Sequence, residues 1–330
     1  MADPVDLYDA KGRKNFLAFG DYRVFLPYLS WTGPKQASVP KFLDSLLLRL
    51  QFYLRPNARP ANAELWKKIK SGFSSPVQSM LLYRTEDARD TDHAGFIKTD
   101  YKNYFIRIFK RHEDLIYQSH QIRFVQEYFA GPFVTTAVVN FFKTILVQEF
   151  IRQKRRIDAT DYVEKKIIHL SEQFLSRPGT KKFPRDIIPL DLPSVFTGDF
   201  DSLGKSIRAW VVRQTCMLHM VPIHGDMTPW NMFVDAEEKL ILTCYERAGW
   251  HVPYYDYFHY LLQPKARNGR ATPIDKIKFD VTYDYLLQAK ALYLIDQLYH
   301  DIADYRFTSE KDAGLRKVIE IKTRWLRELI

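Results

Sequence analysis

The segment from His224 to Asn231, with the sequence HGDMTPWN, most constrains what this chain can fold into. It places the carboxylate of Asp226 five residues before the amide of Asn231. This pattern is typical of loops that transfer phosphoryl groups, in which the carboxylate orients or accepts the proton of an attacking hydroxyl and the amide oxygen holds a metal ion. We therefore predict that Asp226 is a catalytic base and that Asn231 is a metal ligand.

The residues on both sides of this loop predict how it is held. An apolar stripe at mostly helical spacing precedes it, and Pro222 forbids the helix from continuing beyond about Met220. The stripe consists of Leu203, Ile207, Trp210, Val211, Gln214 and Leu218. After the loop, the apolar runs 232–234 and 240–242 flank a polar segment, which is the pattern of a β-hairpin.

The order of these motifs continues with Glu246, Ala248, Gly249 and Asp256. Taken together, they resemble the C-terminal lobe of the aminoglycoside phosphotransferase and choline kinase-like superfamily. The resemblance implies an α+β, two-lobed protein kinase-like fold, with a small β-rich N-lobe, a larger and mostly helical C-lobe, and the nucleotide between them. It also implies ATP-dependent transfer of the γ-phosphoryl group to a hydroxyl of a small molecule.

The resemblance assigns roles to further residues near the loop. His224 would hold the loop through bonds to backbone groups, and Asp256 would anchor the loop from below. Cys244 stands where the family has a metal-binding Asp. A neutral thiol is a poor ligand for Mg²⁺, so binding of ATP with Mg²⁺ or Mn²⁺ should be weakened. Glu246 is an alternative ligand, because in an extended segment it would point to the same side as Cys244.

The first half of the chain predicts a small β-rich lobe. Strands are expected at 79–84, 95–99, 104–109 and 144–151, with a helix from Asp114 to Phe129 between the last two. By the resemblance, a basic residue on the third strand meets the nucleotide phosphates and pairs with a glutamate of the helix. Arg107 and Glu127 are the candidates, with Lys98 and Lys110 as alternatives for the basic residue.

Two further features of this half concern nucleotide binding. The resemblance places Glu149, Phe150 and Ile151 at the hinge, where backbone groups contact adenine. A glycine-rich phosphate loop is missing, since Gly72–Pro76 holds a single glycine. Arg152–Arg156, directly after the hinge, is the densest basic cluster; it would lie near the mouth of the nucleotide site or form a solvated loop.

We therefore expect three parts: an N-terminal extension packed on the small lobe at 1–70, the N-lobe at 71–151, and the C-lobe at 152–330. Within the extension, Phe42–Leu54 is apolar and either packs on the N-lobe or touches a membrane. The C-lobe should end in two helices, at 275–305 and from a capping Ser309 to 330. The aromatic cluster 254–260 is core packing or, alternatively, a platform for the acceptor.

Composition and charge indicate the cellular compartment and the class of substrate. The chain has 330 residues, a net charge of +10 and two cysteines, which favours a reducing compartment. No secretory signal and no apolar run of about 18 residues is present, so we expect a cytoplasmic protein, with peripheral membrane contact as an alternative. The basic charge suits a polar or anionic acceptor, such as a sugar or a saccharide or glycolipid precursor. Nucleic acid is not expected, because no recognition motif occurs. A catalytically impaired pseudokinase, acting as a binding or scaffold protein, is the alternative that Cys244 favours.

Overall fold

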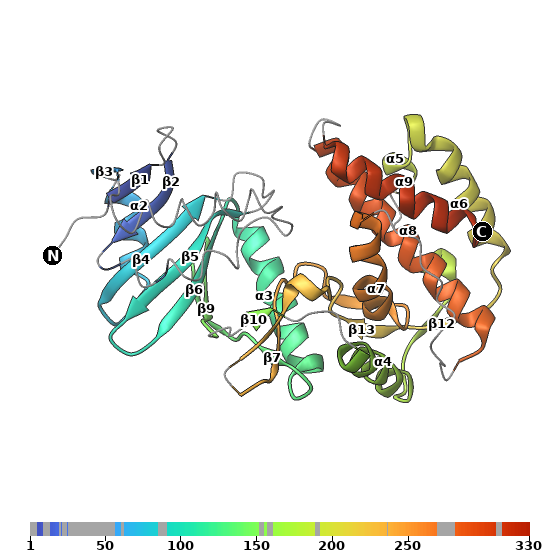
Figure 1. Cartoon of the computed structure of the whole chain (residues 1–330), viewed down its shortest axis with the longest axis horizontal. Coiled ribbons are helices and arrows are strands. Elements are labelled where there is room, and N and C mark those ends of the chain that lie inside the picture. Colours follow the sequence, from blue (N-terminus) through green and yellow to red (C-terminus); the bar gives the residue numbers. More distant parts are fainter. Residues whose placement is uncertain are drawn as a thin grey trace. The chain divides into compact units, whose positions relative to one another are not determined.

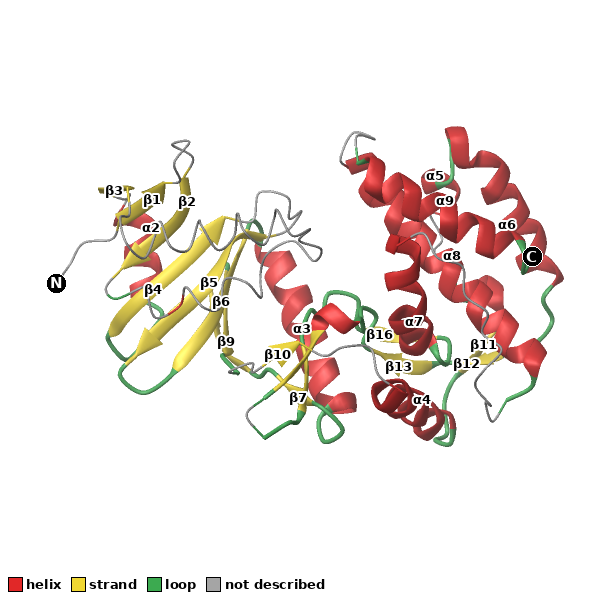
Figure 2. Ribbon diagram, viewed as in Figure 1, coloured by secondary structure: helices red, strands yellow, loops and turns green. Residues whose placement is uncertain are grey.

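The computed structural model describes residues 5–8, 14–19, 21, 25, 57–60, 63–84, 91–151, 155–156, 161–188, 192–235, 237–268, 281–307 and 312–330. The chain divides into two compact units (Figure 1). Unit 1 comprises residues 1–153 with 235–239, and unit 2 comprises 154–234 with 240–330. Strands dominate unit 1 and helices dominate unit 2 (Figure 2), as the predicted α+β kinase-like fold requires.

Unit 1 is built on an eight-stranded antiparallel sheet in the order β3-β1-β2-β4-β5-β6-β9-β8. Its central strands are β4 (Val77–Arg84), β5 (Thr91–Thr99), β6 (Asn103–Phe109) and β9 (Ile145–Glu149), with β8 (Val138–Phe142) at one edge. The helix α3 (His112–Phe129) joins β6 to the later strands. These elements match the strands and the helix that the sequence predicts between residues 79 and 151.

Alternate residues of the central strands form a core with helix α2 (Ala63–Lys70). Trp66 and Ile69 of α2 belong to the same buried cluster as Met80, Ile97 and Val147 of the sheet. Because successive side chains of a strand point to opposite faces, this cluster fixes which residues of β6 point the other way. Ile106 and Ile108 lie in the cluster, so Arg107 lies on the other face.

The residues before 71 are more closely joined to the sheet than the expected packed extension. Strands β1 (Val5–Tyr8), β2 (Lys14–Phe19) and β3 (Asn57–Pro60) lengthen the sheet, because β2 pairs with β4 in an antiparallel register. Backbone pairing, and not side-chain packing alone, therefore attaches this segment. The apolar segment 42–54, expected to pack on the N-lobe or to touch a membrane, lies outside the described residues, as do 152–154 of the basic cluster.

Unit 2 contains the catalytic-loop motif between short strands. Helix α6 (Asp201–Arg213) is followed by β12 (Leu218–His219) and β13 (Val221–Ile223), the loop, and the hairpin β14 (Met232–Val234) with β15 (Leu240–Leu242). The hairpin forms as predicted, and its register pairs Met232 with Leu242 and Val234 with Leu240. Strand β10 (Arg155–Arg156) pairs with β14, and β11 (Lys181–Lys182) pairs with β12.

The predicted extent of the helix before the loop is wrong. Helix α6 ends at Arg213, and the stretch up to Pro222 turns into strands instead. The reason is pairing with segments distant in sequence: β12 pairs with β11, and β13 pairs with β16 (Gly249–His251). Cys216 lies after the end of the helix and is exposed.

Helices form the rest of unit 2. They are α4 (Asp161–Leu175), α5 (Leu192–Val195), α7 (Tyr255–Asn268), α8 (Tyr283–Phe307) and α9 (Ala313–Arg327). The N-cap of α9 is Asp312, whose side chain accepts from Leu315 N; the expected cap, Ser309, lies outside the described residues. Within the described part of the chain, no helix is both long and apolar enough to span a membrane.

Candidate active site

The predicted catalytic loop, residues 224–231, follows β13, and its first turn is anchored by helix α7. The carboxylate of Asp256 accepts hydrogen bonds from His224 N and Gly225 N, both at 2.8 Å. Gly225 has φ +81°, and a Cβ at this position would collide with the backbone carbonyl of Arg247. This is the arrangement that the resemblance predicts for Asp256. Burial raises the pKa of Asp256 to about 7, although the two backbone N–H groups oppose the shift.

Asp226 and Asn231 meet across the loop. Asn231 Nδ2 donates to Asp226 Oδ2 at 2.7 Å and to the Asp226 carbonyl at 2.9 Å. Asn231 is itself fixed, because its carbonyl accepts from both Thr243 N and Thr243 Oγ1. Since Nδ2 is turned toward Asp226, Oδ1 is the atom through which Asn231 would hold a cation.

His259 is a site residue that sequence reasoning missed. Its Nε2 lies 3.0 Å from Asp226 Oδ1, and its side chain is only 2% exposed whereas that of Asp226 is 24% exposed. The available signal was the spacing of Asp256 and His259, which lie three residues apart on one helix and therefore share a face. In the sequence, His259 was one member of an aromatic cluster and drew no separate prediction.

His224 is fully buried beneath the loop. Its Nδ1 accepts from Asp226 N at 3.3 Å, and its ring packs edge-on against Tyr245. Burial lowers the pKa of His224 to about 4, so the imidazole is neutral at neutral pH. A neutral ring that accepts from the loop backbone agrees with the supporting role expected for it.

The segment after β15 differs from the extended conformation assumed for it. Cys244 is half-buried with φ +65°, and a hydrogen bond from Ala248 N to Tyr245 O closes a turn that contains Glu246. The strand alternation that would direct Glu246 and Cys244 to the same side therefore does not apply. Glu246 nevertheless lies near the loop, because its charge raises the pKa of His224 against the larger effect of burial.

These groups fit a magnesium ion poorly. Asn231 Oδ1 and the Glu246 carboxylate are hard oxygen ligands, but the thiol of Cys244 is not. Among the residues that the structure describes, no three His, Cys, Asp or Glu side chains are grouped so that they could hold a metal ion. Asn231 and Glu246 remain the residues that could contribute oxygen ligands.

In unit 1, Arg107 meets a different partner from the one expected. Its guanidinium donates to Gln118 Oε1 of α3 at 2.8 Å, and Gln118 is buried. Glu127 lies nine residues further along the helix, which is 2.5 turns, so it projects from the opposite side. It is also exposed. The predicted pairing of Arg107 with Glu127 is therefore corrected to Gln118.

Of the expected hinge residues, Glu149 is the last residue of strand β9, and Phe150 and Ile151 follow it. Glu149 N donates to Ala137 O and Phe150 N donates to Asn103 O, so both N–H groups are engaged within unit 1. The Glu149 carboxylate lies 3.5 Å from Lys102 Nζ, and the Phe150 ring packs edge-on against Phe96. An adenine base would therefore have to meet this segment through other groups, such as those of Ile151.

Solved structures share the fold of this chain. Choline kinase LicA from Streptococcus pneumoniae is 14% identical, with a TM-score of 0.55 over 80% of this chain and 98% of that one. LicA in complex with AMP gives a TM-score of 0.53 at 14% identity over 82% of this chain and 100% of that one. A candidate fructosamine-3-kinase from Thermobifida fusca is 11% identical, with a TM-score of 0.51 over 81% and 100% of the two chains. No protein-family model matches the chain, and no curated protein matches it significantly.

Proposed function

We propose that this chain, whose fold is that of the protein kinase-like superfamily of choline and fructosamine kinases, transfers the γ-phosphoryl group of ATP to a hydroxyl of a small molecule. The observation that carries the proposal is the state of Asp226. Each oxygen of its carboxylate faces a nitrogen, from Asn231 on one side and from His259 on the other, while the group stays accessible to a substrate. A carboxylate held in this way suits a general base for a hydroxyl.

The other roles follow from the residues around it. Asn231, with Glu246, would supply oxygen ligands for Mg²⁺, which neutralises phosphate charge when it is bound. Arg107 would meet the nucleotide phosphates, with Lys98 and Lys110 as alternatives, and the segment 149–151 would contact adenine. The LicA structure with AMP supports the use of an adenine nucleotide by this fold.

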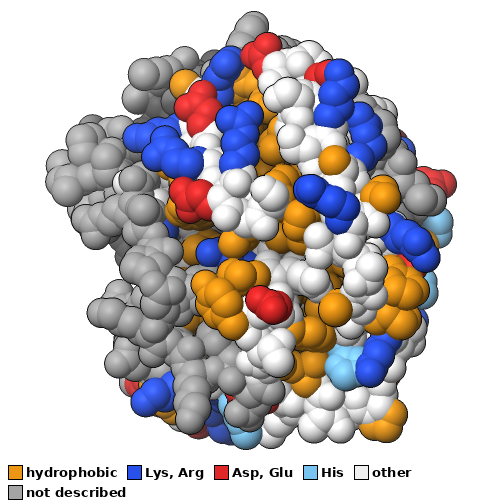
Figure 3. All heavy atoms as spheres, turned by 90° about the vertical axis from the view of Figure 1, so that its right-hand side faces the viewer, with side chains coloured by type: hydrophobic (Ala, Val, Ile, Leu, Met, Phe, Trp, Pro, Cys, Tyr) orange, Lys and Arg blue, Asp and Glu red, His pale blue; other side chains and the backbone are white. Residues whose placement is uncertain are grey.

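A polar or anionic acceptor, such as a sugar or a saccharide or glycolipid precursor, is our proposal for the substrate. The net charge of +10 supports it, and Lys and Arg side chains are spread over the face of unit 2 shown in Figure 3. Beside the loop, the guanidinium of Arg267 lies 4.5 Å from the ring centroid of Trp230. A cation at this position would favour an acceptor that carries negative charge.

A pseudokinase that binds a partner or ligand is the second candidate, and Cys244 is the observation that favours it. A thiol at the position of the metal-binding Asp weakens binding of the ATP–metal complex without disturbing Asp226 or Asn231.

Thermal unfolding with ATP and Mg²⁺ or Mn²⁺ tests both candidates, since a ligand that binds only the folded state raises the melting temperature. The wild type is compared with Cys244→Asp and with Asp226→Asn, and ATP turnover is measured for each. Metal-dependent stabilisation of the wild type, with turnover lost in Asp226→Asn, supports the kinase. Stabilisation of Cys244→Asp alone supports the pseudokinase, and turnover that survives in Asp226→Asn would show that the assigned base is wrong.

A further inference from the structure

One face of helix α7 contacts the catalytic loop twice. Asp256 accepts from two backbone N–H groups at the start of the loop, and His259 contacts the carboxylate of Asp226. Residues three apart on a helix lie on the same side, so the two contacts come from one rigid surface. The helix therefore places both the backbone of the loop and its functional side chain.

The surroundings of His259 determine which ring nitrogen carries the proton. The Tyr293 hydroxyl lies 3.4 Å from Nδ1, which can accept from it, and the rings of Tyr255 and Tyr293 pack around the imidazole. Burial lowers the pKa of His259, and the charges of Lys322 and Arg247 act in the same direction, although the hydrogen bond to Asp226 and its charge oppose the shift. A neutral ring with Nδ1 as acceptor carries its proton on Nε2, the atom that faces Asp226.

Asp226 needs such a donor to keep one orientation. The terminal torsion of an aspartate side chain is broad, so a single hydrogen bond leaves the plane of the carboxylate poorly defined. Asn231 donates to Oδ2 and His259 to Oδ1, which fixes that plane from two elements. A carboxylate oxygen can accept more than one hydrogen bond, and the Asp226 side chain is 24% exposed, so the carboxylate can receive the proton of a hydroxyl.

We propose that His259 is a positioning residue, which donates from Nε2 to Asp226 Oδ1 and thereby orients the base toward the acceptor hydroxyl. Its own proton stays on Nε2 throughout, and Asp226 takes the proton of the acceptor. The inference rests on the proposed function for its effect on turnover, but the hydrogen bond itself can be measured without turnover.

The first test is kinetic and uses hydrolysis of ATP with Mg²⁺, with water as the acceptor, in the wild type or in the Cys244→Asp background. His259→Leu should lower kcat by about 10- to 100-fold, because a misplaced catalytic group costs rates of this order, and should leave KM for ATP unchanged. His259→Gln, which can donate to the same oxygen, should recover most of the loss. The matched control is His251→Leu, since His251 also packs on Tyr255 but faces Asp296 instead of Asp226.

The second test is ¹⁵N NMR of histidine-labelled protein, in which the His259 signal is identified by its absence from His259→Gln. We expect a protonated Nε2 and an unprotonated Nδ1 at pH 7.5, and a shift of the Nε2 resonance in Asp226→Asn. A proton on Nδ1, or a resonance indifferent to Asp226→Asn, overturns the hydrogen bond.

The outcomes separate the two ideas. If neither the wild type nor Cys244→Asp hydrolyses ATP, the proposed function loses its support and the NMR result alone decides on the hydrogen bond. If ATP is hydrolysed and His259→Leu keeps the kcat of the His251→Leu control, the positioning role is wrong while the proposed function stands. Equal kcat values for folded His259→Leu and His259→Gln also contradict the positioning role, because a hydrogen-bond donor at position 259 would then have no effect on turnover.

Discussion

Gly225 and Cys244 both have left-handed backbone conformations, and the free-energy cost of this conformation differs between them. Gly225 has φ +81° and loses nothing, since it carries no Cβ. Cys244 has φ +65°, a conformation that costs most residues about 1–2 kcal/mol and that Asn and Asp tolerate best. The backbone at position 244 thus suits the Asp that the resemblance leads one to expect there, independently of any metal.

This backbone conformation predicts how substitutions at position 244 change stability without ligands. Cys244→Asn should raise the free energy of unfolding by up to about 1 kcal/mol, because Asn adopts positive φ more readily. Cys244→Val should lower it by about 1 kcal/mol or more, because a β-branched residue resists this conformation. Urea unfolding without nucleotide or metal measures both; a Val variant as stable as the wild type would contradict the assignment.

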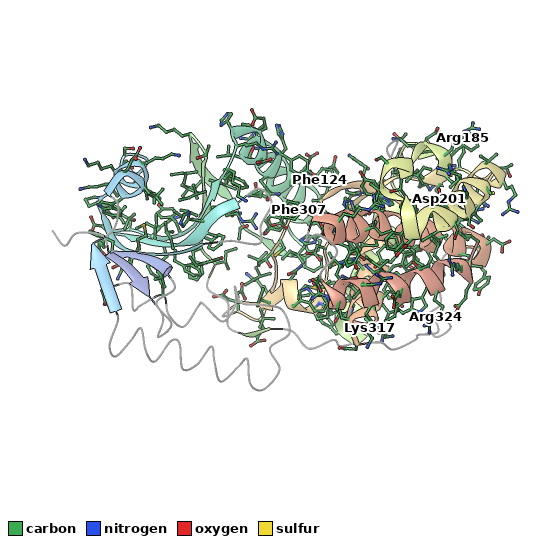
Figure 4. All side chains as sticks on the ribbon, turned by 90° about the horizontal axis from the view of Figure 1, so that it is seen from above. Phe124, Arg185, Asp201, Phe307, Lys317 and Arg324 are labelled. Carbon is green, nitrogen blue, oxygen red and sulfur yellow. The ribbon has the colours of Figure 1, made fainter. Side chains whose placement is uncertain are left out.

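The anchor of the loop predicts a loss of stability in Asp256→Asn. An amide can offer only one oxygen to the N–H groups of His224 and Gly225, so one buried donor is left without an acceptor. This should cost about 1–3 kcal/mol of unfolding free energy. The control is Asp201→Asn on α6 (Figure 4), which removes a surface ion pair with Lys205 worth about 1 kcal/mol or less. Equal losses in the two variants would argue against the anchoring role.

At the scale of elements, a buried ion pair joins the last two helices. Lys322 of α9 is fully buried and its Nζ lies 2.6 Å from Asp301 Oδ2 of α8. It also lies 3.3 Å from Gln297 Oε1, which accepts from Arg247 at 3.4 Å in the turn after Cys244. Through Arg247, whose carbonyl lies against Gly225, the terminal helix is connected to the catalytic loop.

Removing one partner of this pair should be severely destabilising. Lys322→Ala leaves the Asp301 carboxylate buried without its partner, which typically costs about 3–5 kcal/mol. The double variant Lys322→Met with Asp301→Leu should lose less than the single one, because no buried charge remains. Lys317→Ala is the matched control on the same helix, where Lys317 and Arg324 are exposed (Figure 4). Chemical denaturation measures the free energy of unfolding of the single variant, the double variant and the control. If Lys322→Ala is as stable as Lys317→Ala, the buried ion pair does not stabilise the fold.

At the scale of the whole molecule, buried titratable groups predict how stability depends on pH. Burial lowers the folded-state pKa of His224, His251 and His259 below 6.5. Below pH 6.5, the unfolded chain therefore binds protons at these histidines that the folded chain does not bind. Stability through these groups falls as pH falls. Asp256 acts in the opposite sense, since its pKa is raised to about 7 and the folded chain keeps its proton between pH 7 and 3.8.

The balance of these groups gives the expected result. His224, with a pKa of about 4, and Asp256 nearly offset one another, at about 1.4 kcal/mol per pH unit each. His251 and His259 then decide the direction, so the free energy of unfolding should fall between pH 6.5 and 5. In Asp256→Asn the fall should be steeper, because the opposing group is gone. Denaturation at several pH values measures this; a stability that rises on acidification would contradict it.

Much of the fold could be predicted from local patterns. Strands β4, β5, β6 and β9, helix α3 and the hairpin β14–β15 follow from apolar periodicity, because each carries its own alternating or helical pattern. The end of α6 could not be predicted, since Leu218 fits the end of a helical stripe equally well until β11 is known to pair with it. The pairing of residues before 71 with the sheet could not be predicted either, because backbone pairing between distant segments leaves no pattern in the local sequence.

The sequence by itself determined the superfamily resemblance and predicted the role of the loop, because Asp226 and Asn231 stand at the spacing of phosphoryl-transfer loops and the resemblance assigns Asp256 as the anchor of the loop. Only the tertiary structure decided which side chains meet them. It brought His259 to Asp226, replaced Glu127 by Gln118 as the partner of Arg107, and gave Cys244 a left-handed backbone in place of an extended one. Chemistry at fixed spacing is encoded in one stretch of chain, whereas a contact across thirty residues depends on how helices and strands pack, which no single stretch specifies.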